Sequence, residues 1–260
     1  LDGSSAVVEV STALTGTADS VTYELADAEG QVLATAEGLG TVQLAANGIT
    51  PWTPETPALY TLRVTVTANG TADTTEQRIG IRTIQVSSKT GLLLNGQPRT
   101  MKGGCIHHDL GILGAADHAA AERRRIRLMK ESGFDAIRAA HNPFGPAFLD
   151  ACDELGMLVV EEAFDEWVMG RTSFGLHVTF EQCWEKDLED MITRDYNHPC
   201  IVMWSTGNEV EERDGTADGF AWAKRLADKV RSLDASRPVS ATACALFSEY
   251  GNRPAGGTTG

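Results

Sequence analysis

The chain has 260 residues, of which 42% are hydrophobic and 22% charged, and its formal net charge is −14. These values are typical of a soluble globular protein with one or two domains and a sizeable core. Nucleic-acid binding depends on clustered Lys and Arg, so the acidic balance argues against that class of partner.

The ends and the cysteines of the chain bear on its cellular context. No segment approaches the roughly 18 consecutive apolar residues of a membrane span, and the start, LDGSSAVVEV, lacks the regions of a signal peptide. Because the chain also begins without Met, we interpret it as an excerpt of a longer protein. Its five cysteines form no CxxC pair, which disfavours a zinc site or a disulfide framework. Reduced, buried thiols favour the cytoplasm, and export stays open.

The first 87 residues predict a β-sandwich. Short runs rich in Thr, Val and Ala alternate with turn signals and show no helical periodicity. The expected strands are 6–10, 21–25, 31–36, 42–44, 60–67 and 75–81. The segment 51–57 contains three prolines, so we expect a loop or an edge rather than a central strand.

From about residue 91 the pattern changes to strands that alternate with helices. The expected strands are 100–106, 134–138, 157–160, 200–204 and 239–243, and the expected helices are 117–132, 146–155, 179–196 and 216–232. The third helix begins with a capping-box pattern, Thr179 to Gln182, and the fourth turns Phe220 inward with other apolar residues. Such alternation predicts right-handed crossovers and a parallel sheet. A closed eight-fold barrel takes about 250 residues, so we expect its first part only.

Polar side chains follow each of these strands, where the carboxyl ends of a parallel sheet share one mouth. They are His107, His108 and Asp109; Arg138, His141 and Asn142; Glu161, Glu162, Asp165 and Glu166; and Asn208 and Glu209. Their convergence is a stronger signal than any one of them. Singly, His141 could order its loop, residues 211–214 fit a solvated charge run, and Trp204 has the size of a core residue.

A mouth with carboxylates, imidazoles and an Arg, but without a phosphate-binding glycine loop, favours a polar uncharged ligand such as a sugar. Cleavage of a glycosidic bond needs one acid to protonate the leaving oxygen and a second carboxylate to attack or to activate water. Glu209, which follows an apolar strand in MWSTGNEVEE, is the candidate acid/base. We expect partial burial and the neighbouring carboxylates to keep it protonated, and we expect Asn208 to bind a sugar hydroxyl.

Six segments carry a family resemblance. They are LNGQPRTMKGGCIHHDLG, IRAAHNP, LGMLVVEEAFDEW, TRDYNHPCIVMWSTGNE, PWTPETPALYTL and IGIRTIQV. Together they resemble glycoside hydrolase family 2, and the β-galactosidase branch most closely. The resemblance implies an immunoglobulin-like β-sandwich over residues 1–87, followed over residues 88–260 by the first part of a catalytic (β/α)8 TIM barrel. It also implies a retaining hydrolase.

The matching motifs also indicate the site residues. Glu209 matches the general acid/base glutamate of the family, and Asn208 the asparagine before it. The expected substrate-binding residues are Asn208, His141, Arg138, His107, Asn142, Glu166 and Asp165.

The sequence departs from the family pattern twice. Some β-galactosidases bind magnesium through a Glu-x-His after the third strand, but this chain has Val168 in place of the histidine, so we predict no metal and no other cofactor. The nucleophile of the family is a glutamate after a later strand, and we expect it beyond this chain. Glu249 is the only late glutamate, and its surroundings do not match that motif.

Three hypotheses remain open. The first is a retaining β-galactosidase whose isolated 260-residue segment is inactive. The second keeps the family but changes the sugar to a glucuronide or a mannoside. The third is a non-catalytic carbohydrate-binding or structural piece, since only one of two carboxylates is matched. The expected partner is a glycoside, with neither nucleic acid nor membrane, and a homo-oligomer of the full-length protein is left open.

Overall fold

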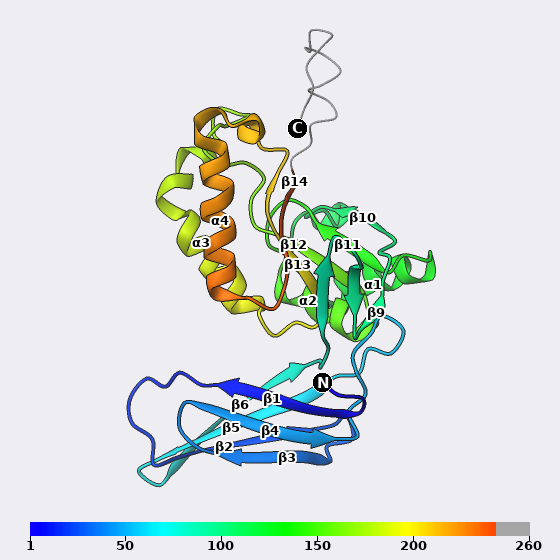
Figure 1. Ribbon diagram of the computed structural model, residues 1–260, viewed down its shortest axis with the longest axis vertical. Helices are drawn as coiled ribbons and strands as arrows, with labels where there is room; N and C mark the ends of the chain where they lie inside the picture. Colours follow the sequence, from blue (N-terminus) through cyan, green and yellow to red (C-terminus); the bar gives the residue numbers. More distant parts are fainter. Residues whose placement is uncertain (243–260) are drawn as a thin grey trace.

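The computed structural model describes residues 1–242, which form two parts with separate hydrophobic cores (Figure 1). The first part is a β-sandwich and the second is a parallel sheet with helices. Both were predicted from the sequence. The domain boundary near residue 87 stays a prediction, and the end of the last expected strand lies outside the described residues, as does Glu249.

The sandwich consists of a two-stranded and a four-stranded antiparallel sheet, in the orders β1-β4 and β3-β2-β5-β6. Its strands are β1 (Ser5–Ser11), β2 (Ser20–Ala26), β3 (Val32–Glu37), β4 (Thr41–Asn47), β5 (Tyr60–Ala68) and β6 (Thr71–Ile79). In β2, the alternate residues Val21, Tyr23 and Leu25 are buried between the sheets. This two-residue period is what the sequence pattern predicted.

A small sheet that was not among the predicted elements follows the sandwich. Its strands are β7 (Ile84–Ser87), β8 (Gly91–Leu94) and β9 (Gln97–Pro98), in the order β7-β8-β9. Leu94 pairs with Gln97, and the two residues between them, Asn95 and Gly96, both have positive φ, at 51° and 74°. Asn-Gly is the preferred pair for a two-residue hairpin turn, so this signal was present in the sequence.

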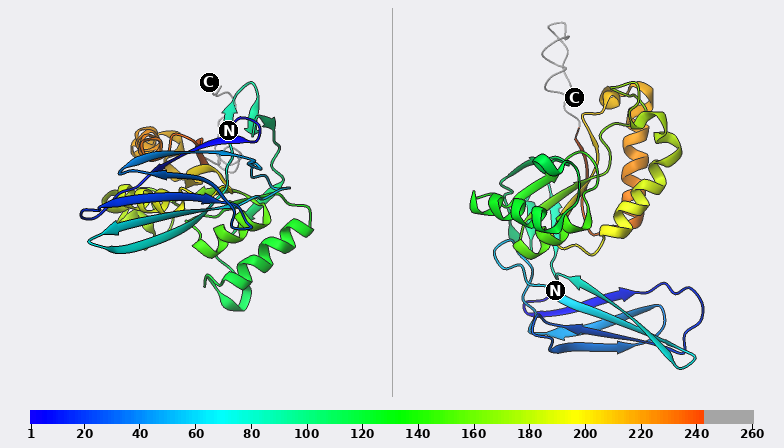
Figure 2. Two further views of the ribbon diagram at one scale, coloured as in Figure 1. Left: turned by 90° about the horizontal axis from the view of Figure 1, so that it is seen from below. Right: turned by 180° about the vertical axis from the view of Figure 1, so that it is seen from behind.

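The second part has five parallel strands in the sequential order β10-β11-β12-β13-β14. The strands are β10 (Gly103–Ile106), β11 (Ala136–Ala139), β12 (Leu158–Glu162), β13 (Ile201–Asn208) and β14 (Val239–Thr242). The helices between them are α1 (Ala119–Glu131), α2 (Pro146–Leu155), α3 (Phe180–Asp195) and α4 (Gly219–Leu233). Figure 2 shows α1 and α2 (green) as one neighbouring pair of helices and α3 and α4 (yellow to orange) as another. A strand order that follows the chain without a reversal is the barrel pattern rather than the doubly wound one.

Two local expectations about the helices are wrong. The capping box does not form at the start of α3, because Thr179 makes no side-chain cap hydrogen bond. In α4 the side chain of Phe220 is 70% exposed, and Trp222 is buried in its place. The helical period of α4 is kept, but its apolar face is rotated relative to the expectation.

The sandwich meets the barrel at the amino ends of the barrel strands. Trp52, in the predicted loop, is fully buried in the barrel-side core, and its Nε1 donates to the carbonyl of Asp153 at 3.0 Å. The Arg82 guanidinium donates to the carbonyls of Pro199 and Ile201, each at 2.6 Å. This junction lies at the opposite end of the strands from the mouth, so it supports the barrel without obstructing the site.

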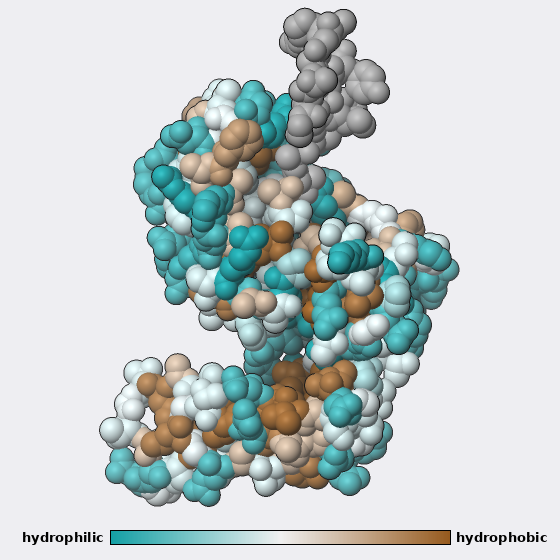
Figure 3. Space-filling view, viewed as in Figure 1, coloured by the Kyte–Doolittle hydropathy of each residue, from teal (hydrophilic) through white to brown (hydrophobic). Residues whose placement is uncertain are grey.

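The surface between the two parts is hollowed. Apolar residues gather on the part of the sandwich nearest the barrel (Figure 3). A cleft of about 600 Å³ lies there, lined by Val10, Leu62 and Ile79 of the sandwich and by Ile192 and Tyr196 at the end of α3.

Among residues 1–242, no helix has the length and apolar character needed to cross a bilayer.

Candidate active site

A buried carboxylate, Glu162, organises the mouth of the sheet. It is the last residue of β12, its side chain is fully buried, and it lies beside Ser205 of β13 in the strand register. The Ser205 hydroxyl donates to Glu162 Oε2 at 2.6 Å. Glu162 therefore joins β12 to β13 at the carboxyl ends of both strands.

Arg138 of β11 makes the main ion pair with Glu162. Its Nη2 donates to Oε1 at 2.8 Å and to Oε2 at 2.7 Å, and its Nε donates to Oε2 at 3.0 Å. Such a fork on a carboxylate fixes the plane of the guanidinium as well as its position. The same Nη2 also donates to Asn208 Oδ1 at 2.8 Å, so Arg138 connects three neighbouring strands.

Asn208 is held at both ends of its amide. Its Oδ1 accepts from Arg138, while its Nδ2 donates to Asp165 Oδ1 at 2.8 Å. Because a guanidinium can only donate, this arrangement settles which end of the amide is oxygen. The pairing of β13 with β14 shifts register between Ser205 and Asn208. In a regular strand, Ser205 and Asn208 would point to opposite faces, because they are an odd number of residues apart. The register shift lets both side chains reach the same network.

His141 reaches the same carboxylate from the loop after β11. Its Nδ1 lies 2.8 Å from Glu162 Oε1, so Nδ1 carries the hydrogen and Nε2 stays available to a ligand. The ring of His107, after β10, packs edge-on against it with centroids 5.0 Å apart. Four of the predicted residues, Arg138, His141, Asn208 and Asp165, thus share one network, and His107 borders it.

Glu209 follows Asn208 directly and has a positive φ of 45°. Its side chain is 49% exposed, so it is partly buried. The nearest cation is Arg171, whose Nη1 lies 3.9 Å from Glu209 Oε2. The candidate acid is therefore open to solvent at the rim of the mouth, beside a fixed positive charge.

The two acidic residues predicted after β12 separate. Asp165 joins the network through Asn208 and forms an ion pair with Arg171. Glu166 turns away into the following loop and accepts from the backbone N–H of Arg171 at 2.9 Å and from His177 Nδ1 at 3.0 Å. Its carboxylate holds the loop and makes no hydrogen bond to the Asn208 network.

Asn142 is another predicted site residue whose contacts lie outside this network. Its carbonyl lies 3.1 Å from His108 Nε2. With Pro143 it lines a separate cavity of about 310 Å³, together with Asp187, Asp190 and other residues of α3. The structure therefore does not bring Asn142 into hydrogen-bonding contact with the Arg138–Glu162 network.

The residues after β12 do not fit a divalent metal. The side chain of Val168 offers no ligand atom, and both oxygens of Glu166 accept hydrogen bonds from the loop that comes after it. We therefore assign no metal-binding role to these residues.

Asp153, His198 and Cys200 form the one cluster of potential metal ligands within residues 1–242. It lies at the amino end of β13, near the sandwich. Asp153 Oδ2 pairs with His198 Nδ1 at 2.6 Å, and Oδ1 accepts from the backbone N–H of Cys200 at 2.9 Å. Burial raises the pKa of the Cys200 thiol well above its usual range, which keeps the thiol protonated. The cluster is satisfied internally and supports the strand end.

The cysteines depart in part from the expectation of buried thiols. Cys152 and Cys200 are free and buried, but Cys183 is half-buried, and Cys105 is exposed. Cys105 Sγ lies 3.4 Å from Arg138 Nη1, at the edge of the mouth.

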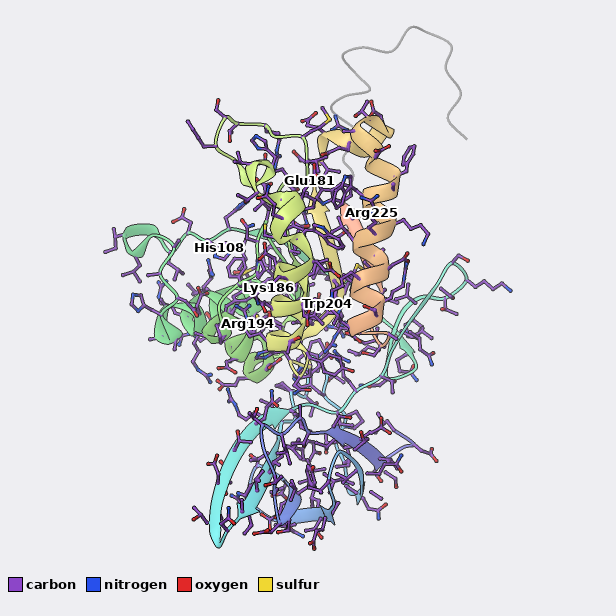
Figure 4. All side chains as sticks on the ribbon, turned by 90° about the vertical axis from the view of Figure 1, so that its left-hand side faces the viewer. His108, Glu181, Lys186, Arg194, Trp204 and Arg225 are labelled. Carbon is purple, nitrogen blue, oxygen red and sulfur yellow. The ribbon has the colours of Figure 1, made fainter. Side chains whose placement is uncertain are left out.

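One further expectation about a single residue is wrong, and one is confirmed. Glu212, placed in a solvated charge run, is fully buried and accepts from the backbone N–H of Met169. Trp204 lies beneath α3 and α4, away from the mouth (Figure 4), where its Nε1 donates to Asp234 Oδ2 at 2.7 Å. It is a core residue, as its size alone suggested.

Sequence reasoning missed Glu162, Ser205 and Arg171. Glu162 was noted among the acids after β12 but was not selected as a site residue. The signal was available, because Glu161 and Glu162 end an apolar strand and alternation puts only one of them on the mouth side. Nothing in the sequence marked Arg171, which lies in an irregular loop.

Comparison with known families decides what this arrangement belongs to. Residues 84–249 match the model described as "Glycosyl hydrolases family 2, TIM barrel domain", and residues 2–82 match "Glycosyl hydrolases family 2". The chain belongs to glycoside hydrolase family 2. The two matches follow each other along the chain as the sandwich and the barrel do.

Individual relatives in family 2 carry different sugar names. A β-galactosidase of Bacteroides ovatus is 35% identical over 93% of this chain, which covers 34% of that protein. A putative β-glucuronidase of Formosa agariphila is 34% identical over 85% of this chain and 22% of its own length. The chain thus spans about a third or less of these relatives.

Solved family 2 structures share the fold. A member from Bacteroides cellulosilyticus superposes with a TM-score of 0.82 at 36% identity, over 86% of this chain and 30% of that one. A β-glucuronidase from Ruminococcus gnavus in complex with uronic deoxynojirimycin superposes with a TM-score of 0.82 at 30% identity, over 92% of this chain and 41% of that one. Sandwich and barrel are therefore arranged as in these enzymes.

Proposed function

We propose that this chain supplies the acid/base half of a retaining β-galactoside hydrolase. The observation that carries the proposal is the position of Glu209, directly after Asn208, whose amide is fixed by Arg138 and Asp165 at the mouth of the sheet. Active sites of barrel enzymes collect at this end of the strands.

Substrate binding would use the hydrogen-bonding capacity that the network leaves free. Asn208 Nδ2 has a second hydrogen beyond the one donated to Asp165, and His141 Nε2 is turned away from Glu162. Both groups are rigid, because their partners are buried or ion-paired. They suit the hydroxyls of a sugar ring held next to Glu209.

The reaction would proceed in two displacements. Glu209 gives its proton to the glycosidic oxygen as the bond from the anomeric carbon to that oxygen breaks, while a second carboxylate attacks the anomeric carbon from the opposite face. Glu209, now a carboxylate, then takes a proton from water as the water oxygen displaces the enzyme ester. We propose that the second carboxylate comes from outside the described residues. The exposure of Glu209 suits an acid that exchanges protons with a departing sugar and with water.

No metal is needed in this proposal. The charge that balances Glu162 comes from Arg138, and the cation beside Glu209 is Arg171. We therefore propose that hydrolysis is independent of added magnesium.

A glucuronide is the second candidate substrate. It is favoured by the relatives named as β-glucuronidases, at 34% identity in sequence and 30% in a solved structure. A panel of chromogenic β-galactosides, β-glucuronides and β-mannosides, offered to the full-length protein, distinguishes the sugars by kcat/KM. The galactoside proposal fails if another sugar is hydrolysed faster.

Glu209→Gln tests the acid/base role in the full-length protein. We expect kcat for lactose to fall by about 10²–10⁴-fold, because a glutamine cannot donate the proton. Glu211→Gln is the matched control, since Glu211 is an exposed glutamate two residues away that pairs with Arg213, and we expect it to leave kcat unchanged. Near wild-type lactose hydrolysis by Glu209→Gln would show that Glu209 is not the general acid.

A further inference from the structure

The loop between β12 and α3 is anchored against β13, the strand that ends directly before Glu209. Trp167 is buried, and its Nε1 donates to the carbonyl of Thr206 in β13 at 2.8 Å. The backbone N–H of Met169 donates to the buried carboxylate of Glu212. The loop therefore has a defined position relative to the end of β13.

Glu166 fixes the backbone of Arg171 within this loop. Its Oε2 accepts from the N–H of Arg171 at 2.9 Å, and its Oε1 accepts from the N–H and Nδ1 of His177, at 3.1 and 3.0 Å. A Cβ on Gly175 would collide with this carboxylate, so the glycine permits the close approach. Although burial opposes it, these hydrogen bonds lower the pKa of Glu166 and keep it an acceptor.

The side chain of Arg171 then reaches back to the mouth. Its Nη2 donates to the carbonyl of Asp165 at 2.7 Å and forms an ion pair with the carboxylate of the same residue. Its Nη1 lies 3.9 Å from Glu209 Oε2. Asp165 in turn accepts from Asn208, so a continuous chain of contacts runs from Arg171 through Asp165 to Asn208, which directly precedes Glu209.

We propose that Arg171 is a positioning residue for Glu209. This inference rests on the proposed function, because it assumes that Glu209 is the general acid. Glu209 has no other charged partner within 4.0 Å among the described residues, and half of its side chain is exposed. A free glutamate at a rim samples several rotamers, and a guanidinium held on two sides by its own loop limits that choice.

The effect of losing Arg171 on the rate of hydrolysis should depend on the leaving group of the substrate. Proton donation matters most when the departing oxygen is a poor leaving group, as in a disaccharide or an alkyl glycoside. It matters little for a dinitrophenolate, which departs without a proton. Loss of Arg171 should therefore slow the first class of substrate and spare the second, whereas general damage to the loop would slow both equally.

The experiment compares Arg171→Met and Arg171→Lys with wild type in the full-length protein. Two substrates of the sugar that wild type hydrolyses fastest are used, the 2,4-dinitrophenyl glycoside and the methyl glycoside. For Arg171→Met we expect kcat/KM to fall about tenfold or more for the methyl glycoside and less than about twofold for the dinitrophenyl glycoside. Lysine should restore part of the loss, because it returns the charge without the fork.

The controls separate the possible failures. Arg127→Met removes an exposed arginine of α1, which lies 3.9 Å from its acidic partner Glu131, and should change neither substrate. An equal fall for both substrates in Arg171→Met, or full activity in that variant, would overturn the role of Arg171. If Glu209→Gln retains hydrolysis of the methyl glycoside, the proposed function itself fails, which is a different result.

Discussion

Glu161 and Glu162 are neighbours in sequence with opposite surroundings. Alternation along β12 turns Glu162 to the mouth, where Arg138 and His141 pair with it. Glu161 faces away from the mouth, where it accepts from the backbone N–H of Phe144 and leaves Oε2 without a partner among the described residues. Burial, and then the charge of Asp195, raise the pKa of Glu161 well above its ordinary value.

Glu161 therefore predicts a pH-dependent stability. A carboxyl whose folded pKa is raised stabilises the fold fully below its unfolded value, about pH 4.3, and this contribution is lost as pH rises through the folded pKa. Glu161→Gln keeps the acceptor oxygen and cannot ionise. Urea unfolding between pH 5 and 8 should show the wild type losing free energy of unfolding relative to the variant as pH rises. A constant difference across that range would contradict this interpretation.

At the site, the sequence predicted which residues lie near the mouth better than it predicted which of them contact one another. Arg138, His141, Asn208 and Asp165 were expected together because they follow neighbouring parallel strands, and they do form one network. Glu166 and Asn142 also follow strands, but loop geometry turns them elsewhere. Strand-end position is visible in a sequence, whereas the direction of a side chain within an irregular loop is not.

At the scale of elements, the helices and strands were predictable because apolar residues recur along each of them at the spacing of a helix or of a strand. α2 was expected over residues 146–155 and is found there, since Pro starts it and Gly156, at a φ of 72°, ends it. The choice of the buried face was harder. In α4, Phe220 and Trp222 are both large and aromatic, and only packing against α3 decides between them.

This choice gives a matched pair of variants in α4. Trp222 is 7% exposed and Phe220 is 70% exposed. Trp222→Ala should lower the free energy of unfolding by about 3–5 kcal/mol, because it leaves a cavity between α3 and α4. Phe220→Ala should change it by about 0.5 kcal/mol or less. Chemical denaturation measures both, and equal losses would mean that the face of α4 is assigned incorrectly.

At the scale of the whole molecule, a sandwich followed by part of a barrel was predictable from the change in sequence pattern. How the two parts join was not. The segment 51–57, expected to be a loop or an edge, places Trp52 in the barrel core, and Arg82 ties the end of the sandwich to the start of β13. Such contacts join residues that lie more than a hundred positions apart in the sequence, and they leave no local pattern. They support the amino ends of the barrel strands, whereas Glu209 lies at the mouth, at the carboxyl ends.

The role of Glu209 is tested most directly by azide rescue of the full-length protein carrying Glu209→Ala. A dinitrophenolate departs without a proton, so the glycosyl-enzyme still forms in this variant. It then accumulates, because the general base that activates water is missing. Azide attacks without a base, so we predict faster turnover with added azide and a β-glycosyl azide as the product. Turnover that azide does not accelerate, or an α-glycosyl azide, would contradict the assignment of Glu209 as the acid/base of a retaining hydrolase.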